Sequence, residues 1–288
     1  MEVILATDGS QSAEEAAWLL AHLPHTATLE LTVLFVCNIP ILGGPASELT
    51  RRLQAEDAEK AAAVFAHLQD IFEGANAVLE LVVAHGHIGE TILTESQTRK
   101  SDLVVVGAVG HSMLDRLFGS TSDFVATHAS CSVLVVRPTG LKNAKRPIDV
   151  CVAHDASSPS SAVFEQLSQF RWGVNSKMEV ASVVSLPFMY SEIPYEFDIE
   201  EIKKATLKDL ESVAIRLRKY SPNVVAQVLE ANHVGSGLVQ FAQQKKSDIV
   251  VMGSTGSGLL NRFVLGSTSK YVLRHAACSV WIARNKTE

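Results

Sequence analysis

A long internal repeat constrains the fold of this chain more than any other feature of its sequence. The stretch 102–122 recurs as 248–269, each copy being an apolar run, a glycine-rich segment and a closing Gly-Ser-Thr-Ser. The first copy is one residue shorter just before its last glycine, Gly119, which corresponds to Gly266. A repeat of this period is too long for a solenoid unit and indicates a duplicated domain.

The remainder of the chain repeats as well. An apolar run ending at Asp8 returns as one that ends at Asp155. The length of 288 residues fits two domains of roughly 150 residues each. We therefore predict a first domain at 1–139, a linker at 140–147, which is polar and basic, and a second domain at 148–288.

In both halves, short apolar runs alternate with amphipathic helical patterns. We expect strands at 3–6, 28–36, 78–84, 102–106 and 133–136, then at 149–153, 180–184, 224–229, 249–252 and 280–283. Helices are expected at 12–22, 49–72 and 89–98, and a fourth is expected to end at about 129. In the second half they are expected at 198–219, 235–244 and 270–275. This alternation predicts an α/β class, with parallel sheets covered by helices on both faces. Ligands of such sheets bind beyond the carboxyl ends of the strands, where the strand order reverses.

Composition and charge exclude several classes of protein. A formal net charge of −6 and a pI of about 5.9 argue against nucleic acid as the main partner. The N-terminus lacks the basic start of a signal peptide, and no apolar stretch is long enough to span a membrane. The four cysteines form no C-x-x-C pair, which favours small buried residues in a reducing cytoplasm.

The glycine-rich repeat has the parts of a phosphate site. Gly253, Gly256 and Gly258 allow a sharply turning loop whose N–H groups can face an anion. A helix follows, for which we expect Ser267 or Thr268 as the N-cap, and a helix start is a ready anion-binding site. The loop is not a Walker P-loop, because no G-x-x-x-x-G-K-[ST] is present, nor is it the dinucleotide G-x-G-x-x-G.

The chain resembles a tandem universal stress protein, and the resemblance covers nearly all of the chain. An Asp-x-Ser after the first strand, an Asp-[Leu/Ile]-Val-Val-x-Gly strand and a closing His-Ala-x-Cys-Ser-Val carry it. The family's nucleotide motif, G-x2-G-x9-G-[ST], is met at 253–267, whereas the copy at 107–120 has eight residues in place of nine. The resemblance implies two flavodoxin/Rossmann-like domains, each with a five-stranded parallel sheet.

The resemblance also implies ATP binding, with Mg²⁺ held by the phosphates and water. The adenosine end would contact an Asp after the first strand and a Val at the end of the second, and the phosphates would contact the glycine loop and the hydroxyls after it. In the second domain these residues are Asp155, Val183, Gly253, Gly256, Ser257, Gly266, Ser267, Thr268 and Ser269. In the first domain they are Asp8, Val36, Gly107, Gly110, Gly119, Ser120, Thr121 and Ser122. For each Asp, local helix capping is the alternative role.

We expect the second site to bind more tightly. The first copy has the shorter loop, and its Asp123 stands where the second has Lys270, so an acid would oppose a triphosphate there. His85 and His87 flank a glycine, but no further metal ligands are evident in the sequence, so we expect no metal site. The His111-Ser112 pair lacks a third member of a catalytic triad.

The sequence thus predicts an ATP-binding stress-response protein, a nucleotide sensor or regulator, with no catalytic residues and at most slow hydrolysis. One alternative is an interaction scaffold of the same fold that binds no nucleotide, and another is a genuine hydrolase or nucleotide-transfer enzyme. The apolar last strands, 133–136 and 280–283, are expected at sheet edges. The resemblance suggests that the two domains pair there as a pseudo-dimer, and association of two chains stays open.

Overall fold

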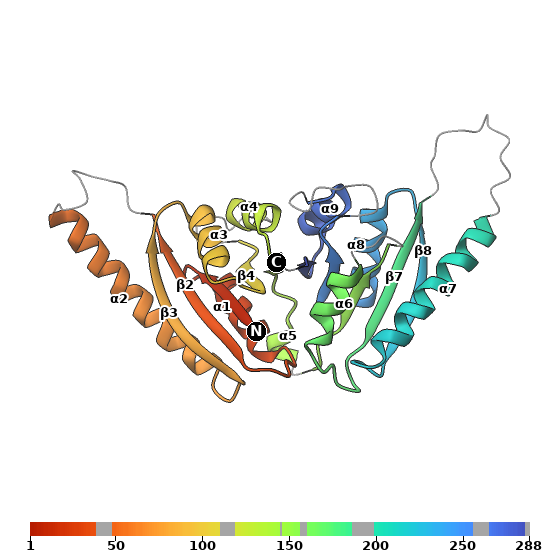
Figure 1. The fold of residues 1–288 in the computed structure, drawn as a ribbon, viewed down its shortest axis with the longest axis horizontal. Coiled ribbons are helices and arrows are strands. Elements are labelled where there is room, and N and C mark those ends of the chain that lie inside the picture. The colour runs from red at the N-terminus through yellow and green to blue at the C-terminus, as the bar shows by residue number, and fades with distance from the viewer. Residues whose placement is uncertain are drawn as a thin grey trace. The chain divides into compact units, whose positions relative to one another are not determined.

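The computed structural model describes residues 1–38, 48–109, 119–144, 146–155, 160–185, 199–255 and 265–285, without the side chains of Ser160 and Ser161. The chain divides into two compact units, whose boundary falls between Pro138 and Thr139 (Figure 1). Each unit alternates strands with helices, which confirms the predicted α/β class.

The first unit contains a five-stranded parallel sheet. Its elements are β1 (Glu2–Thr7), α1 (Gln11–His22), β2 (Leu29–Cys37), α2 (Glu48–Ile71), β3 (Ala77–His85), α3 (Ile88–Thr98), β4 (Leu103–Gly107), α4 (Ser120–His128) and β5 (Ser132–Val136). The strand order is β3-β2-β1-β4-β5, with every pair parallel. The order reverses between β1 and β4, so the first and fourth strands flank the crevice.

The second unit repeats this plan. Its elements are α5 (Leu141–Ala144), β6 (Val150–Ala153), α6 (Ser160–Ser168), β7 (Met178–Ser185), α7 (Ile199–Leu217), β8 (Val224–Ala231), α8 (Val234–Lys245), β9 (Ile249–Gly253), α9 (Ser267–His275) and β10 (Ser279–Ala283). The strand order is β10-β9-β6-β7-β8, again parallel. Neither α5 nor α6 was among the expected helices.

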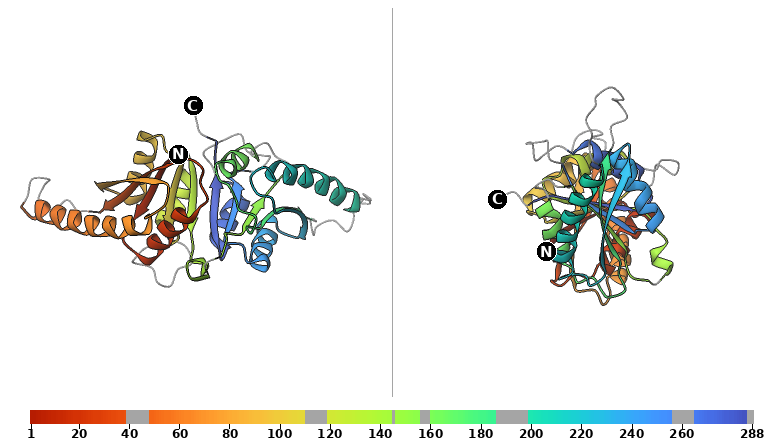
Figure 2. Two further views of the ribbon diagram at one scale, coloured as in Figure 1. Left: turned by 90° about the horizontal axis from the view of Figure 1, so that it is seen from below. Right: turned by 90° about the vertical axis from the view of Figure 1, so that its right-hand side faces the viewer.

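Burial on both faces explains why the central strands have continuous apolar runs. In β4 and β9 the first four residues are all buried, and β5 and β10 are buried throughout. In the first unit, α1 and α2 lie on one face of the sheet and α3 and α4 on the other (Figure 2). Each Leu, Ile or Val side chain removed from water there contributes about 1.5–3 kcal/mol. β5 and β10 are the end strands of their own sheets, and the pairing of the two units stays a prediction.

The segment expected to be a linker is attached to the second unit. Leu141 of α5 is 3% exposed. The two terminal nitrogens of Arg146, Nη1 and Nη2, donate to the Asp248 carboxylate over 2.7 and 2.8 Å. That carboxylate also accepts the backbone N–H of Asp149 at 2.8 Å. The proposed boundaries at 139 and 148 stay a prediction, but Arg146 belongs to the packing of the second unit.

The helices that the structure describes include none that is both long enough and apolar enough to cross a membrane.

Candidate functional site

A cavity of about 220 Å³ lies at the carboxyl ends of the first unit's strands. The structure brings around it seven residues that the sequence placed in the first site: Asp8, Val36, Gly107, Gly119, Ser120, Thr121 and Ser122. They come from β1, β2, β4 and the start of α4. The eighth, Gly110, lies outside the described residues.

A second cavity, of about 390 Å³, occupies the same place in the second unit. Seven of its lining residues were also expected from the sequence: Asp155, Val183, Gly253, Gly266, Ser267, Thr268 and Ser269. Gly256 and Ser257 lie outside the described residues. In both units, segments far apart in the sequence therefore converge on one cavity at the point where the strand order reverses.

Glycine begins the helix beside each cavity. Gly119 (φ −85°, ψ 152°) is the N-cap of α4 and Gly266 (φ −62°, ψ 157°) that of α9, and neither start has a side-chain cap. The expectation that Ser267 or Thr268 caps the second helix was wrong, because the helix begins one residue earlier. By contrast, the Ser10 hydroxyl caps α1. The first N–H groups of α4 and α9 lack partners within their own helices, and each adds the positive end of a helix dipole.

The last serine of each Ser-Thr-Ser triplet holds the helix start on the strand. Ser122 is 4% exposed and its Oγ donates to the Gly107 carbonyl at 2.7 Å. Ser269 is 3% exposed and its Oγ donates to the Gly253 carbonyl at 2.9 Å. Each hydroxyl proton is therefore used within the protein. The sequence did not reveal this role, because the glycine partner lies fifteen or sixteen positions away.

Each cavity also has an apolar wall, which the sequence identified only in part. In the first unit Val36 is joined there by Leu34, Ile88 and Ile92. In the second unit Val183 is joined by Val234, Leu238 and Met252. The helix residues in these lists come from α3 and α8, whose amphipathic patterns were visible but whose place beside the cavity was not. An apolar wall opposite polar groups suits a ligand with a flat apolar part and a charged part.

The carboxylate at the end of the first strand has a local partner. Asp8 is exposed, and its Oδ1 accepts the Ser10 N–H at 3.0 Å. Local capping, the alternative to ligand binding, is thus present for one oxygen of Asp8.

One sequence comparison decides the family. Residues 1–137 and 149–284 each match the universal stress protein family. The chain belongs to the universal stress protein family. It is a tandem member, with one family domain in each unit, as the repeat predicted.

Relatives of this universal stress protein match either nearly all of the chain or a part of it. Universal stress protein Rv2005c of Mycobacterium tuberculosis is 25% identical over 298 residues, covering 98% of this chain and 96% of the relative. Universal stress protein MJ0531 of Methanocaldococcus jannaschii is 30% identical over 107 residues, which are 37% of this chain and 61% of that protein. The crystal structure of a universal stress protein from Archaeoglobus fulgidus has a TM-score of 0.69 at 19% identity, covering 98% of both chains. That likeness shows the fold.

The two cavities of this universal stress protein differ at the end of the first strand. In the first unit Thr7 precedes the aspartate, and its Oγ1 accepts the Gly9 N–H at 3.1 Å. In the second unit that position is His154, whose Nε2 lies 2.8 Å from Oδ2 of Asp209 on α7. His154 lines the cavity and was not among the expected site residues. Its contact with Asp209 could not be seen in the sequence, because the two residues are fifty-five positions apart.

Histidines elsewhere have structural partners. Nδ1 of His128 lies 2.8 Å from the Phe124 carbonyl, and Nδ1 of His275 lies 2.8 Å from the Tyr271 carbonyl. Both bonds are at helix C-termini, as expected from the sequence. His233 caps α8, since its Nδ1 accepts the Ser236 N–H at 3.1 Å. His111 and Ser112 lie outside the described residues.

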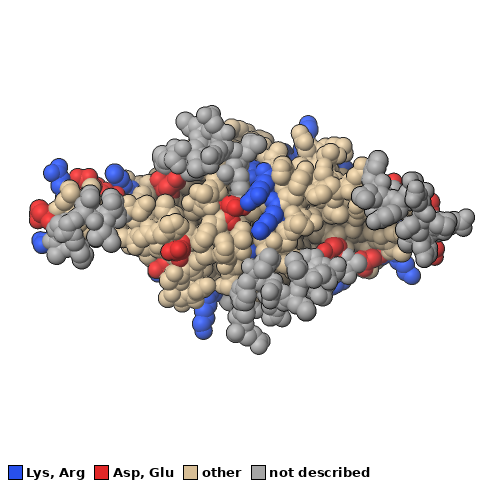
Figure 3. All heavy atoms as spheres, turned by 90° about the horizontal axis from the view of Figure 1, so that it is seen from above, with Lys and Arg blue, Asp and Glu red and all other residues tan. Residues whose placement is uncertain are grey.

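On the face drawn in Figure 3, acidic and basic side chains occur in small groups, and most of the described surface is neither. This distribution agrees with the formal net charge of −6. On the described part of this face, the charges do not form the broad basic surface that a duplex nucleic acid requires.

Proposed function

We propose that this universal stress protein binds ATP in the cavity of each unit and acts as a nucleotide sensor or regulator. One observation carries the proposal. Each cavity joins an apolar wall, a strand-end carboxylate and a helix start without a side-chain cap. These are the groups that an adenine, a ribose and a polyphosphate require.

The parts of the nucleotide can be assigned to the described residues. The base would lie against Val36 or Val183, and the ribose hydroxyls would donate to Asp8 or Asp155. The phosphates would accept from the first N–H groups of α4 or α9 and from the hydroxyls of the residue pairs 120–121 and 267–268. Mg²⁺ would be held by the phosphates and water, because it keeps much of its hydration shell.

The second cavity should bind the nucleotide more tightly. Asp123 lies in the first turn of α4, close to where the phosphates would sit. The corresponding residue of α9 is Lys270, and that helix has no acid in its first turn. An anion is therefore repelled at the first site and attracted at the second.

Hydrolysis should be slow at both sites. The titratable residues among the described lining of the two cavities are Asp8, His154 and Asp155. All three lie at the ends of β1 and β6, where we place the adenosine, and a general base must reach the water that attacks the terminal phosphate. All four cysteines are buried, in keeping with the reducing cytoplasm that we propose for the protein.

Denaturing the purified protein and identifying the released small molecules tests the proposal directly. We expect an adenine nucleotide, and we expect calorimetry on the stripped protein to show ATP binding that raises the melting temperature. A stripped protein that gives no heat and no melting shift with millimolar ATP or AMP would favour the interaction scaffold. Steady ADP production that Gly266→Val abolishes would instead favour the hydrolase.

A further inference from the structure

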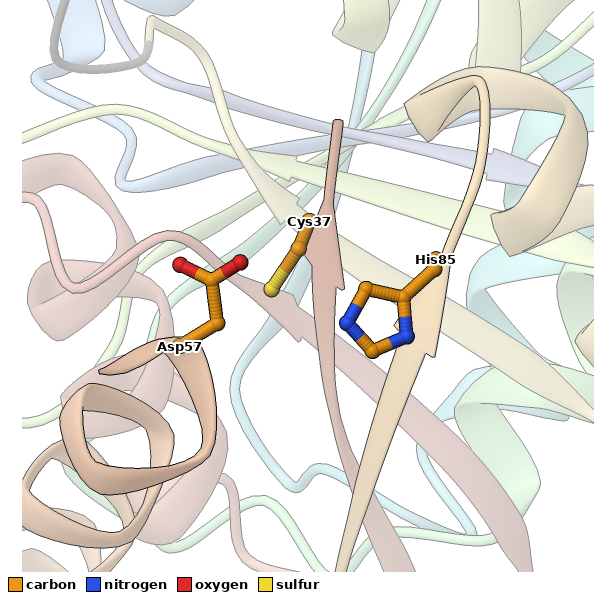
Figure 4. Close-up of side chains that lie close together, drawn as sticks. All are labelled: Cys37, Asp57 and His85. Carbon is orange, nitrogen blue, oxygen red and sulfur yellow. The ribbon is translucent and has the colours of Figure 1, made fainter. Parts of the chain in front are cut away.

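Three side chains of metal-ligand type converge in the first unit, outside the nucleotide cavity. Cys37 ends β2, His85 ends β3 and Asp57 lies on α2, and Figure 4 shows the three side chains beside one another. Their ligand atoms, the cysteine sulfur, one carboxylate oxygen and one ring nitrogen, all lie within 4.8 Å of one another. No metal site was expected at His85, because the sequence shows no further ligands beside it, but the fold brings two ligand-type side chains to it.

The sheet fixes two of the three ligands. Cys37 and His85 are register partners in the parallel β2–β3 pair, so their side chains leave the sheet on the same face. Val36, the preceding residue, lines the nucleotide cavity. Because successive side chains alternate between faces, the Cys37 cluster lies on the opposite face of the sheet from that cavity.

The surroundings of the thiol join it to the carboxylate. Cys37 is 6% exposed, and burial together with a hydrogen bond to Asp57 raises the pKa of its thiol to about 11. Lys60 opposes this shift and lies 3.9 Å from an Asp57 oxygen, but its side chain is 68% exposed and can turn away. Metal binding would release the thiol proton to solvent, because a cysteine ligand binds as the thiolate.

Small side-chain movements would give the geometry of a metal centre. With a zinc–sulfur bond of about 2.3 Å and zinc–nitrogen and zinc–oxygen bonds of about 2.0 Å, tetrahedral ligand atoms lie about 3.5 Å apart. The separations in the cluster, 4.8 Å or less, exceed this value by about 1.3 Å at most. His85 is exposed and Asp57 extends from a helix, so both can rotate inward without moving the strands.

The second unit provides a comparison within the same chain. At the matching place β7 and β8 pair Val184 with Glu230, and α7 presents Lys203. Lys203 Nζ lies 2.6 Å from Glu230 Oε1, so an ion pair joins the helix to the sheet there. At this place the second unit has the ammonium group of Lys203 instead of a metal ligand, so we expect no metal to bind there.

We propose that Cys37, Asp57 and His85 bind a divalent transition-metal cation, Zn²⁺ by preference, with the fourth position open to water. The donor set supports this choice, since thiolate and imidazole suit zinc, whereas Mg²⁺ and Ca²⁺ prefer oxygen ligands alone. Three protein ligands with one open position distinguish this set from closed structural sites, which have four protein ligands. The bound ion would join α2 to the ends of β2 and β3.

Titration of the nucleotide-free full-length protein with Co²⁺, and then with Zn²⁺, tests this site. Cobalt bound to a thiolate gives a sulfur-to-metal charge-transfer band in the near ultraviolet. We expect one equivalent of Co²⁺ to produce this band and one equivalent of Zn²⁺ to remove it. Cys37→Ser should abolish the band, and His85→Ala and Asp57→Asn should weaken Zn²⁺ binding more than the 10–100-fold typical of outer-shell changes.

Matched variants control for folding and for other thiols and histidines. Cys131→Ser removes a second buried cysteine, and His87→Ala removes the histidine two residues from His85. Both should keep the band and the affinity, and melting curves should show that every variant folds. The proposal is overturned if no band forms, if the band survives Cys37→Ser, or if His85→Ala and Asp57→Asn bind Zn²⁺ as tightly as the parent.

Discussion

Replacing Gly119 by aspartate should separate the stability of α4 from its capacity to bind an anion. Gly119 is the N-cap, in the extended conformation that N-cap residues adopt. A Cβ there would lie 3.2 Å from the Ala108 carbonyl oxygen and 3.6 Å from Cα of Val109, which requires only a small adjustment. The new carboxylate would accept the N–H groups of Thr121 or Ser122, which we assign to phosphate.

The two effects of Gly119→Asp differ greatly in size. An aspartate cap gains a few tenths of a kcal/mol over glycine, and its charge near the helix dipole adds about 0.3–1 kcal/mol. The tight contact offsets part of this, so the free energy of unfolding should change by less than about 1 kcal/mol. Opposite a phosphate about 4 Å away, at an effective dielectric of about 20, the same charge costs about 4 kcal/mol, or roughly a thousandfold in affinity.

Calorimetric titration of ATP into stripped protein, with urea unfolding in parallel, measures both effects. Gly119→Asp should eliminate binding at the first cavity, Gly266→Asp at the second, and the double variant at both. Gly119→Asn is the control, because it supplies the cap without the charge and should weaken binding only about tenfold through the occupied N–H groups. A double variant that unfolds like the parent yet binds ATP unchanged would refute phosphate binding at these helix starts.

Further outcomes follow from contacts at three other places in the chain. Gly107→Ala should lower the free energy of unfolding by about 1–3 kcal/mol in urea, since the new Cβ would lie 2.5 Å from Oγ and 2.8 Å from the backbone carbon of Ser12. The thiol of Cys37, with its pKa raised to about 11, should react slowly with a disulfide reagent at pH 8. Because the folded state holds that proton more tightly, this group's contribution to stability is complete below about pH 9 and is lost as the pH rises to about 11. Arg146→Ala should cost about 2 kcal/mol, because it leaves the Asp248 carboxylate, 1% exposed, without its counter-charge; the arginine is 36% exposed, which keeps the cost below the roughly 3–5 kcal/mol of a fully buried pair.

Matched controls accompany these three predictions. Gly173→Ala should be nearly neutral, because no atom lies within 4 Å of its added Cβ. Asp57→Asn should bring the reactivity of Cys37 closer to that of an ordinary thiol, since a hydrogen bond and a negative charge are both weakened. Arg52→Ala breaks an ion pair whose arginine side chain is 78% exposed and should change stability by less than about 0.5 kcal/mol. An equal loss of stability in Gly173→Ala and Gly107→Ala, or in Arg52→Ala and Arg146→Ala, would contradict the corresponding explanation. A Cys37 reactivity that Asp57→Asn leaves unchanged would contradict the third.

The sequence predicted the parts of the fold that local pattern determines. The apolar run of β4 and its copy in β9 identified strands buried on both faces. Ligands of parallel α/β sheets bind at the carboxyl ends of the strands, so Asp8 and Gly107, which each lie at the end of a predicted strand, could be assigned to one site before the structure was known.

Contacts between distant residues were not predictable in this way. Arg146 looked like part of a polar linker because its partner lies 102 positions away. Ser122 looked like a phosphate ligand because the sequence does not show where a hydroxyl proton points, and the structure directs it to a carbonyl. Cys37 and His85 became neighbours only through the β2–β3 register, which spacing along the chain does not determine.

The ion pair between Arg146 and Asp248 decides where the second half of this protein can be cut for separate production. A fragment that begins at residue 148, the boundary drawn from composition, would lack Arg146 and leave the buried Asp248 carboxylate without its counter-charge. A fragment that begins at Thr139 keeps both α5 and the guanidinium. The longer fragment should therefore fold more stably and is the better reagent for measuring nucleotide affinity at the second cavity alone.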